Sequence, residues 1–195
     1  MSYEVLLVSE QRMKEYTPLD NNIRVEDITA HILNAQDIYT QSLLGTKFYK
    51  RLKDGVRSND LNTDEQELLN DYASKSLMWY AYYLMLPNIK FKVMDKGVVD
   101  GTSEETGQTS LDDLKYLRQD ALNNAQFHQN RCLEFLKDYP AKFPEYETPG
   151  TKGMHPNKNT PYFSGLVTNI PKSKSYYEKK CGDCDGTIEG PAIES

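Results

Sequence analysis

Apolar residues recur every three or four positions over four stretches of the chain, and this spacing predicts four amphipathic helices. The first helix is expected over residues 25–43, just ahead of Gly45. A short second helix would have Thr46 as its cap and would end at Gly55. A further turn of helix, capped by Ser9, is expected over residues 9–16.

The two longest helices are expected in the middle of the chain. One begins with Thr63, which stands three residues before Gln66 and so predicts a capping box, and it ends at Pro87. Its second half, residues 77–86, is apolar on every side, which is typical of a helix that is buried all round. The other runs from Ser110 to residue 139 and would be about 40 Å long.

A polar segment, residues 88–109, separates these two helices. Its start alternates apolar and basic residues, and Asp-Gly and Lys-Gly turn signals follow, so that a short hairpin is expected. The remainder has no apolar periodicity, which leaves open a linker, a lid over an active site or a projection used for contact.

The composition changes after Tyr139, because seven of the nine prolines and six of the eleven glycines follow that residue. We therefore predict an all-α protein with a four-helix core over residues 1–139. Residues 140–195 would form an extended C-terminal arm with little regular structure, which docks on a partner. The residues expected to dock are Tyr162, Phe163, Leu166, Ile170, Tyr176 and Tyr177.

The apolar half of the third helix is also a candidate surface between subunits. Its residues Met78, Trp79, Tyr82 and Met85 carry more apolar area than one side of a helix needs. The alternative is that the arm or the first helix covers them within the same chain.

The net charge of −6 argues against a general affinity for nucleic acid or for anionic membranes. The N-terminus lacks the pattern of a signal peptide, and the longest apolar run is about half of what a bilayer requires. The sequence therefore predicts a soluble cytosolic protein. One basic cluster, Lys47, Lys50, Arg51 and Lys53, keeps DNA binding as an alternative.

Candidate chemistry is sparse. Cys181 and Cys184 have the spacing of a zinc or redox pair, but the chain has no second such pair, and an exposed turn is the favoured interpretation. His31 and His128 lie on or near apolar helix faces, where a hydrogen-bonded structural histidine is more common than a base or ligand. His155 lies in a predicted turn. With no P-loop, GxSxG or HExxH motif, we expect no enzyme and no cofactor.

Two strings and one short motif resemble the head–tail connector (adaptor) proteins of tailed phages, with the closest similarity to those of Bacteroidetes-infecting and crAss-like phages. Residues 35–52, AQDIYTQSLLGTKFYKRL, resemble an Ala-x-x-x-Tyr…Leu-Leu-Gly-Thr…Tyr…Leu stretch of that family. Residues 95–121 resemble its second signature, a Lys-Gly turn and a Ser-rich loop before a Leu-x-x-Leu-x-x-Tyr/Leu-Arg helix. FPEY at 143–146 is similar to the end of the family's helical core.

The resemblance covers residues 5–146 and implies a structural virion protein without catalytic residues. Such proteins form a ring of about twelve copies beneath the portal, join head to tail and continue the DNA channel. The implied partners are further copies of the chain, the portal protein, other tail or ring proteins, and DNA in the channel, with no membrane. The implied location is the head–tail junction of the virion, reached from the host cytoplasm. The resemblance also implies that the loop over residues 96–109 projects toward the channel lumen or the adjoining ring. The loop residues implied to face the lumen or contact that ring are Lys96, Asp100, Glu104, Glu105 and Gln108. A DNA-binding or packaging accessory protein is the alternative, and a metal or redox protein built on Cys181 and Cys184 is the third interpretation.

Overall fold

The structure is a computed structural model that describes residues 4–94, 97–100, 110–148, 150 and 152–158. Over these residues the fold is all-α apart from one short hairpin, as the hydrophobic pattern predicts. By internal contacts the chain divides between Tyr162 and Phe163, and all described residues belong to the first part. The predicted docking residues of the arm, 162–177, lie outside the described residues.

The predicted helices at the start of the chain are confirmed. Helix α1 (Glu10–Tyr16) is capped by Ser9, whose hydroxyl accepts a hydrogen bond from the Arg12 amide. The next helix is continuous but carries a wide turn: α2 (Val25–Ala35) passes through a π-helical segment, η1 (Gln36–Thr40), into α3 (Gln41–Leu44). It ends at Gly45, whose φ of +77° favours glycine.

The predicted bounds of the short second helix, α4 (Thr46–Ser58), are wrong at both ends. Thr46 is inside the helix and does not cap it, because its hydroxyl instead accepts from the Met154 amide at 2.8 Å. Gly55 does not end the helix either. It is buried within α4, where a Cβ would lie 2.4 Å from Leu61 Cδ2, and the helix ends at Asn59 in the left-handed conformation.

The third helix is continuous through α5 (Thr63–Glu67), the π-helical segment η2 (Leu68–Ala73) and α6 (Ser74–Lys90). A capping box is present, but one residue earlier than predicted, between Asn62 and Glu65. The carboxylate of Glu65 also binds Arg51 at 2.9 Å, which favours this register. Pro87 does not stop the helix, because in the last turn it removes only one backbone hydrogen bond.

The expected hairpin and fourth helix follow. Strands β1 (Phe91–Met94) and β2 (Gly97–Asp100) pair antiparallel, with Phe91 opposite Asp100. Helix α7 (Leu111–Asp138) begins with a capping box between Ser110 and Asp113. The backbone of Asp100 is described, but the contact residues Lys96, Glu104, Glu105 and Gln108 lie outside the described residues.

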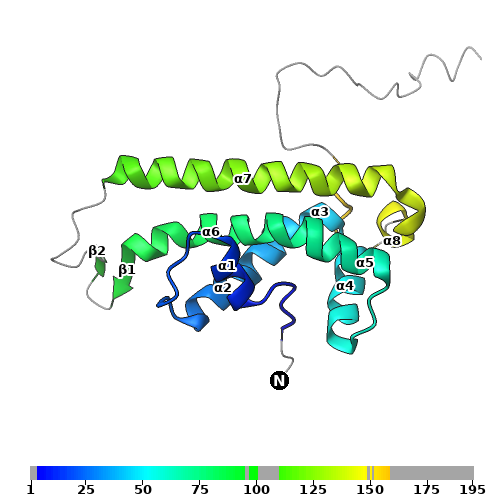
Figure 1. Cartoon of the computed structure of the whole chain (residues 1–195), viewed down its shortest axis with the longest axis horizontal. Helices are drawn as coiled ribbons and strands as arrows, with labels where there is room; N and C mark the ends of the chain where they lie inside the picture. The colour runs from blue at the N-terminus through cyan, green and yellow to red at the C-terminus, as the bar shows by residue number, and fades with distance from the viewer. Residues whose placement is uncertain (1–3, 95–96, 101–109, 149, 151, 159–195) are drawn as a thin grey trace, which may run out of the picture. The chain divides into compact units, whose positions relative to one another are not determined.

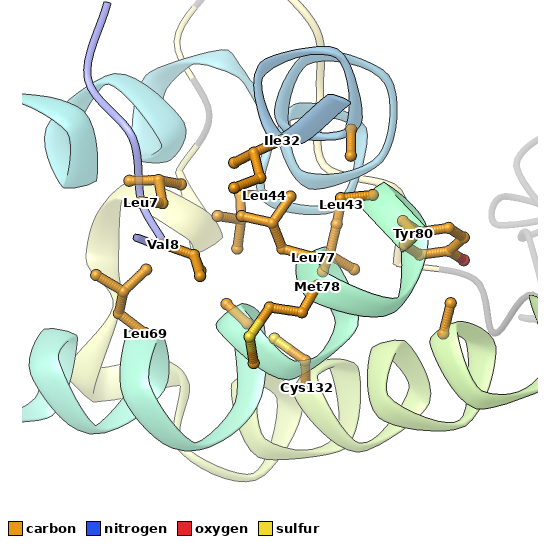
Figure 2. Packing of buried hydrophobic residues seen from close by; sticks show 14 of the residues in the cluster. Leu7, Val8, Ile32, Leu43, Leu44, Leu69, Leu77, Met78, Tyr80 and Cys132 are labelled. Atoms are coloured by element: carbon orange, nitrogen blue, oxygen red, sulfur yellow. The ribbon is translucent and has the colours of Figure 1, made fainter. Parts of the chain in front are cut away.

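Helix α7 runs alongside α6, and α2 packs on another side of α6 (Figure 1). The core therefore forms around α6. Figure 2 shows side chains from the N-terminal segment, α2, α3, η2, α6 and α7 pointing into this one cluster. The labelled members are Leu7, Val8, Ile32, Leu43, Leu44, Leu69, Leu77, Met78, Tyr80 and Cys132.

The core continues beyond the boundary predicted at residue 139. After α7 the chain forms a 3₁₀ turn, η3 (Pro140–Lys142), and a single turn of helix, α8 (Pro144–Glu147). Phe143 and Tyr146 are fully buried, and both rings pack against Phe48 of α4. The first residues assigned to the arm are thus part of the core.

Candidate functional site

The apolar half of α6 is not a free surface, so the predicted subunit interface is wrong there. Met78, Tyr82 and Met85 are buried within the single chain, and Trp79 is half-buried against the Tyr82 ring. Helices α2 and α7 both pack on α6 and cover these side chains. The alternative cover by the first helix is found through α2, and α7 adds to it. Residues 159–195 of the arm lie outside the described residues.

The exposed side of α7 carries the described surface that most needs an explanation. We call Tyr116, Asp120, Asn123 and Phe127 the outer stripe, because their spacing of four, three and four residues places them on one face. All four are exposed, and Tyr116 and Phe127 remain 73% and 57% accessible. The inward side of the same helix carries the buried residues Leu114, Ala121, Ala125 and Cys132.

Sequence reasoning followed the inward residues of α7 and missed the outer stripe. The available signal was the pair Tyr116 and Phe127, which lie about three turns apart and off the inward face. A single exposed apolar residue needs no explanation, whereas two aromatic rings aligned on one rigid helix are typical of a contact surface. Full burial of a Phe-sized side chain contributes roughly 1.5–3 kcal/mol.

A second group of partly exposed side chains lies where η1, α6 and α7 meet. Tyr39 of η1 stacks on Tyr80 of α6, with ring centroids 3.8 Å apart. The Arg118 guanidinium lies over the Tyr83 ring, 4.5 Å from its centroid. Burial raises the pKa of Tyr39, nearby Tyr83 raises it further, and Arg118 opposes the shift. We call Tyr39, Tyr83 and Arg118 the tyrosine–arginine cluster.

This cluster brings together the two strings that resemble the connector family, since Tyr39 lies in residues 35–52 and Arg118 in residues 95–121. Nothing in the spacing of those strings predicted their meeting. Arg118 is half-buried, and its Nε is buried without a hydrogen-bond partner among the described residues. A buried donor left without an acceptor costs about 1–3 kcal/mol, so an acceptor from another molecule would stabilise Arg118.

The predicted basic cluster on α4 is largely engaged within the chain. Lys47 donates to the Thr148 carbonyl at 3.0 Å. Arg51 binds the Glu65 carboxylate, and Lys53 lies 5.2 Å from the centroid of the Tyr49 ring. Only Lys50 of the four is exposed with no contact of this kind in the described part of the chain. The arrangement therefore does not favour a phosphate-binding face.

The histidines of the helical core have structural contacts. His31 donates from Nδ1 to the Asp27 carbonyl, and its Nε2 accepts from the Asn88 amide at 2.7 Å, which links α2 to the end of α6. His128 is half-buried beside Tyr16, and burial together with Lys75 and Arg131 lowers its pKa. His155 is exposed.

The cysteines offer no assembled site among the described residues. Burial raises the pKa of the Cys132 thiol to about 12, so it stays protonated at neutral pH. Cys181 and Cys184 lie outside the described residues. Within the described ranges no three His, Cys, Asp or Glu side chains are grouped so that they could hold a metal ion.

The start of the arm is clamped to the corner between α3 and α4. The Thr46 amide donates to the Met154 carbonyl at 2.9 Å, and the Asn157 amide donates to the Ser42 carbonyl at 2.9 Å. Gly45 lets this segment approach, since a Cβ there would lie 2.7 Å from Pro156. The last described residues of the arm, 152–158, therefore lie at this corner.

Comparison with known proteins places the chain in a family but assigns it no activity. No helix of the described part combines the length and the apolar character needed to cross a bilayer. No curated protein and no solved structure matches the chain. A family of unknown function, DUF6712, matches residues 40–154, a range that includes α4, the long α6 and α7 helices and the start of the clamped segment as far as Met154. Because this match spans more than half of the sequence, the chain belongs to the DUF6712 family.

Proposed function

We propose that the chain is a structural connector of a tailed phage, which forms a ring beneath the portal, joins head to tail and continues the DNA channel. The proposal starts from the resemblance of residues 5–146 to the head–tail connector family. The observation that carries it furthest is the outer stripe of α7. A rigid helix that presents two exposed aromatic rings along one face is suited to packing against another subunit.

The α6–α7 pair supplies the stiff element that such a ring needs. Helix α7 has 28 residues and is about 42 Å long, and it packs against α6 and the π-helical segment η2. In a closed ring each copy uses two different surfaces, one toward each neighbour. The outer stripe would be one of these surfaces. A net charge of −6 also suits a DNA conduit, because strong phosphate contacts would slow the passage of DNA.

The proposal is tested by the native mass of the purified protein over a range of concentrations, with imaging of large species. Closed rings of about a dozen copies are expected. If the protein alone stays monomeric, the same measurement is made with the portal protein as a template. Failure to form rings under both conditions would contradict the proposed function.

A double variant tests the role of the outer stripe within such rings. Tyr116→Ser with Phe127→Ser should weaken ring formation by about tenfold or more, because two aromatic anchors are lost. Its free energy of unfolding should change by no more than about 0.5 kcal/mol, since both side chains are exposed. Val25→Ser is the matched control, because Val25 is also an exposed apolar residue but lies at the start of α2, away from the outer stripe. Rings that form normally in the double variant would remove the stripe from the interface.

A further inference from the structure

In the tyrosine–arginine cluster, three donor groups (the Tyr39 and Tyr83 hydroxyls and the Arg118 guanidinium) have no hydrogen-bond acceptor among the described residues. The hydroxyls of Tyr39 and Tyr83 make no hydrogen bond there, and Arg118 makes no ion pair. On its own helix, the positions three and four residues from Arg118 hold Leu114, Lys115, Ala121 and Leu122, none of which is acidic. The guanidinium is therefore left with its charge unpaired beside two aromatic rings.

Arg118 differs in this respect from the other arginines, all of which the structure describes. Arg24, Arg51 and Arg57 each bind a carboxylate, and Arg12 binds the side chain and carbonyl of Asn70. Arg131 makes no such contact, but it is exposed, whereas Arg118 is half-buried. Water satisfies an exposed guanidinium, and a half-buried one depends more on a fixed acceptor.

Asp120 lies on the opposite flank of the α6–α7 pair. It is exposed on the outer stripe, and it forms no ion pair in the described part of the chain. Round the helix, Arg118 and Asp120 are about 160° apart. Arg118 lies on Tyr83, while Asp120 is close enough to Tyr82 to help burial raise the pKa of that tyrosine. The Asp120 carboxylate accepts one weak hydrogen bond, from the Asn124 side-chain amide at 3.3 Å. One flank thus presents a cation and the other a carboxylate, and neither has an ion-pair partner in the described part of the chain.

We infer that the tyrosine–arginine cluster of one copy binds the outer stripe of a second copy, with the Asp120 carboxylate paired to the Arg118 guanidinium. Arginine binds a carboxylate through two parallel hydrogen bonds, and the Tyr39 and Tyr83 hydroxyls can donate to the same group. Tyr116 and Phe127 of the stripe then pack beside the tyrosine rings of the cluster. The inference rests on the proposed function, because it needs copies placed flank to flank.

A carboxylate of a second copy fits the cluster better than a nucleic-acid phosphate does. The chain has 29 acidic and 23 basic residues, so its overall field repels DNA and no broad basic surface surrounds Arg118. The two flanks are also different surfaces on opposite sides of one element. Contacts of this head-to-tail kind build rings when the rotation between copies closes, whereas one self-complementary surface gives only a dimer.

Charge reversal tests the pairing. Arg118→Asp and Asp120→Arg should each raise the concentration for half-maximal assembly by about tenfold or more, and the double variant should bring it back toward that of the wild type. The matched control is Arg131→Asp, which removes the other unpaired arginine of α7 and should assemble normally. Single variants that assemble like the wild type, or a double variant no better than the singles, would overturn the inference.

A cross-linking arm covers the case in which charge reversal prevents folding. In Arg118→Lys a carbodiimide should join the introduced amine to Asp120, and mixing ¹⁴N- and ¹⁵N-labelled protein shows whether the link joins two copies. Arg131→Lys is the control and should give no such link. A link within one chain, or no link at high protein concentration, overturns the inference. So does duplex DNA binding that Arg118→Gln abolishes, since this would make the ligand a phosphate.

These outcomes separate the inference from the proposed function. Closed rings without the Arg118–Asp120 link would leave the connector proposal standing and remove only this contact. Absence of rings, even with portal protein, counts against the connector itself.

Discussion

Helices α6 and α7 lie side by side and together dominate the chain, yet they meet the solvent in opposite ways (Figure 1). Helix α6 is apolar on most sides, and nine of its seventeen residues are buried. Helix α7 is longer, but it buries only a narrow inward face and leaves the outer stripe open. The difference shows that α6 forms the centre of the core. Helix α7 covers one side of α6 with its inward face and leaves its outer face exposed for contact with another molecule.

The two helices also differ in what their aromatic residues do. Tyr80 of α6 is buried, and its hydroxyl donates a hydrogen bond to the Gln129 amide oxygen of α7, which links the two helices. Among the large hydrophobic and aromatic residues that the structure describes, Tyr116 of α7 is the most exposed. The same residue type therefore stabilises the fold on one helix and remains available for contact on the other.

The largest contrast should come from shortening one side chain on each helix. Met78→Ala should lower the free energy of unfolding by about 2–5 kcal/mol, because it opens a cavity in the core. Phe127→Ala should change it by no more than about 0.5 kcal/mol. Urea unfolding of both variants measures this. A mild Met78→Ala effect would show that α6 is not the centre of the fold and would revive its role between subunits.

A smaller contrast should come from removing one hydroxyl. Tyr80→Phe leaves the buried Gln129 amide oxygen without its donor, and should cost about 1–3 kcal/mol of stability. Tyr116→Phe removes a hydroxyl that faces water and should leave the thermal midpoint unchanged. Equal midpoints for the two variants would mean that the Tyr80–Gln129 bond does not hold α6 to α7.

The smallest effect should be a pH dependence from His128, which joins the inner side of α7 to α1. Burial lowers the pKa of His128 below its unfolded value of about 6.5, so the unfolded state takes up the proton first as pH falls. The free energy of unfolding that depends on neutral His128 is therefore at its full value above about pH 6.5 and falls as the pH drops below that value. Urea midpoints at pH 7.5 and 5.5 should differ less in His128→Asn than in the wild type. His155→Asn, at an exposed site, should behave like the wild type.

Several local expectations failed where a distant residue competed for the same group. The capping box formed at Asn62 rather than Thr63, because Glu65 in that register also reaches Arg51. Thr46 did not cap α4, because its hydroxyl holds the segment around Met154, which lies far away in the sequence. Local capping rules weigh only neighbouring residues, and both outcomes depend on tertiary contacts.

The candidate site was foreseen less well than the fold. The apolar pattern predicted Met78, Tyr82 and Met85 as part of a subunit interface. Such a pattern shows how much apolar surface a helix has, but it does not show what covers that surface. The cover came from α2 and α7. The tyrosine–arginine cluster could not be foreseen either, because it depends on the π-helical turn at η1 that brings Tyr39 onto Tyr80.

The sequence by itself determined the all-α class, the polar hairpin between two long helices, and the inward face of each helix. These features depend on the spacing of apolar residues and on nearby turn and capping residues, which act over a few positions. Only the tertiary structure decided which apolar surface is covered, that Phe143 and Tyr146 complete the core, and that Arg118 lies unpaired on the flank opposite Asp120. Burial and charge pairing depend on residues far apart in the chain, so they are settled only when the helices pack.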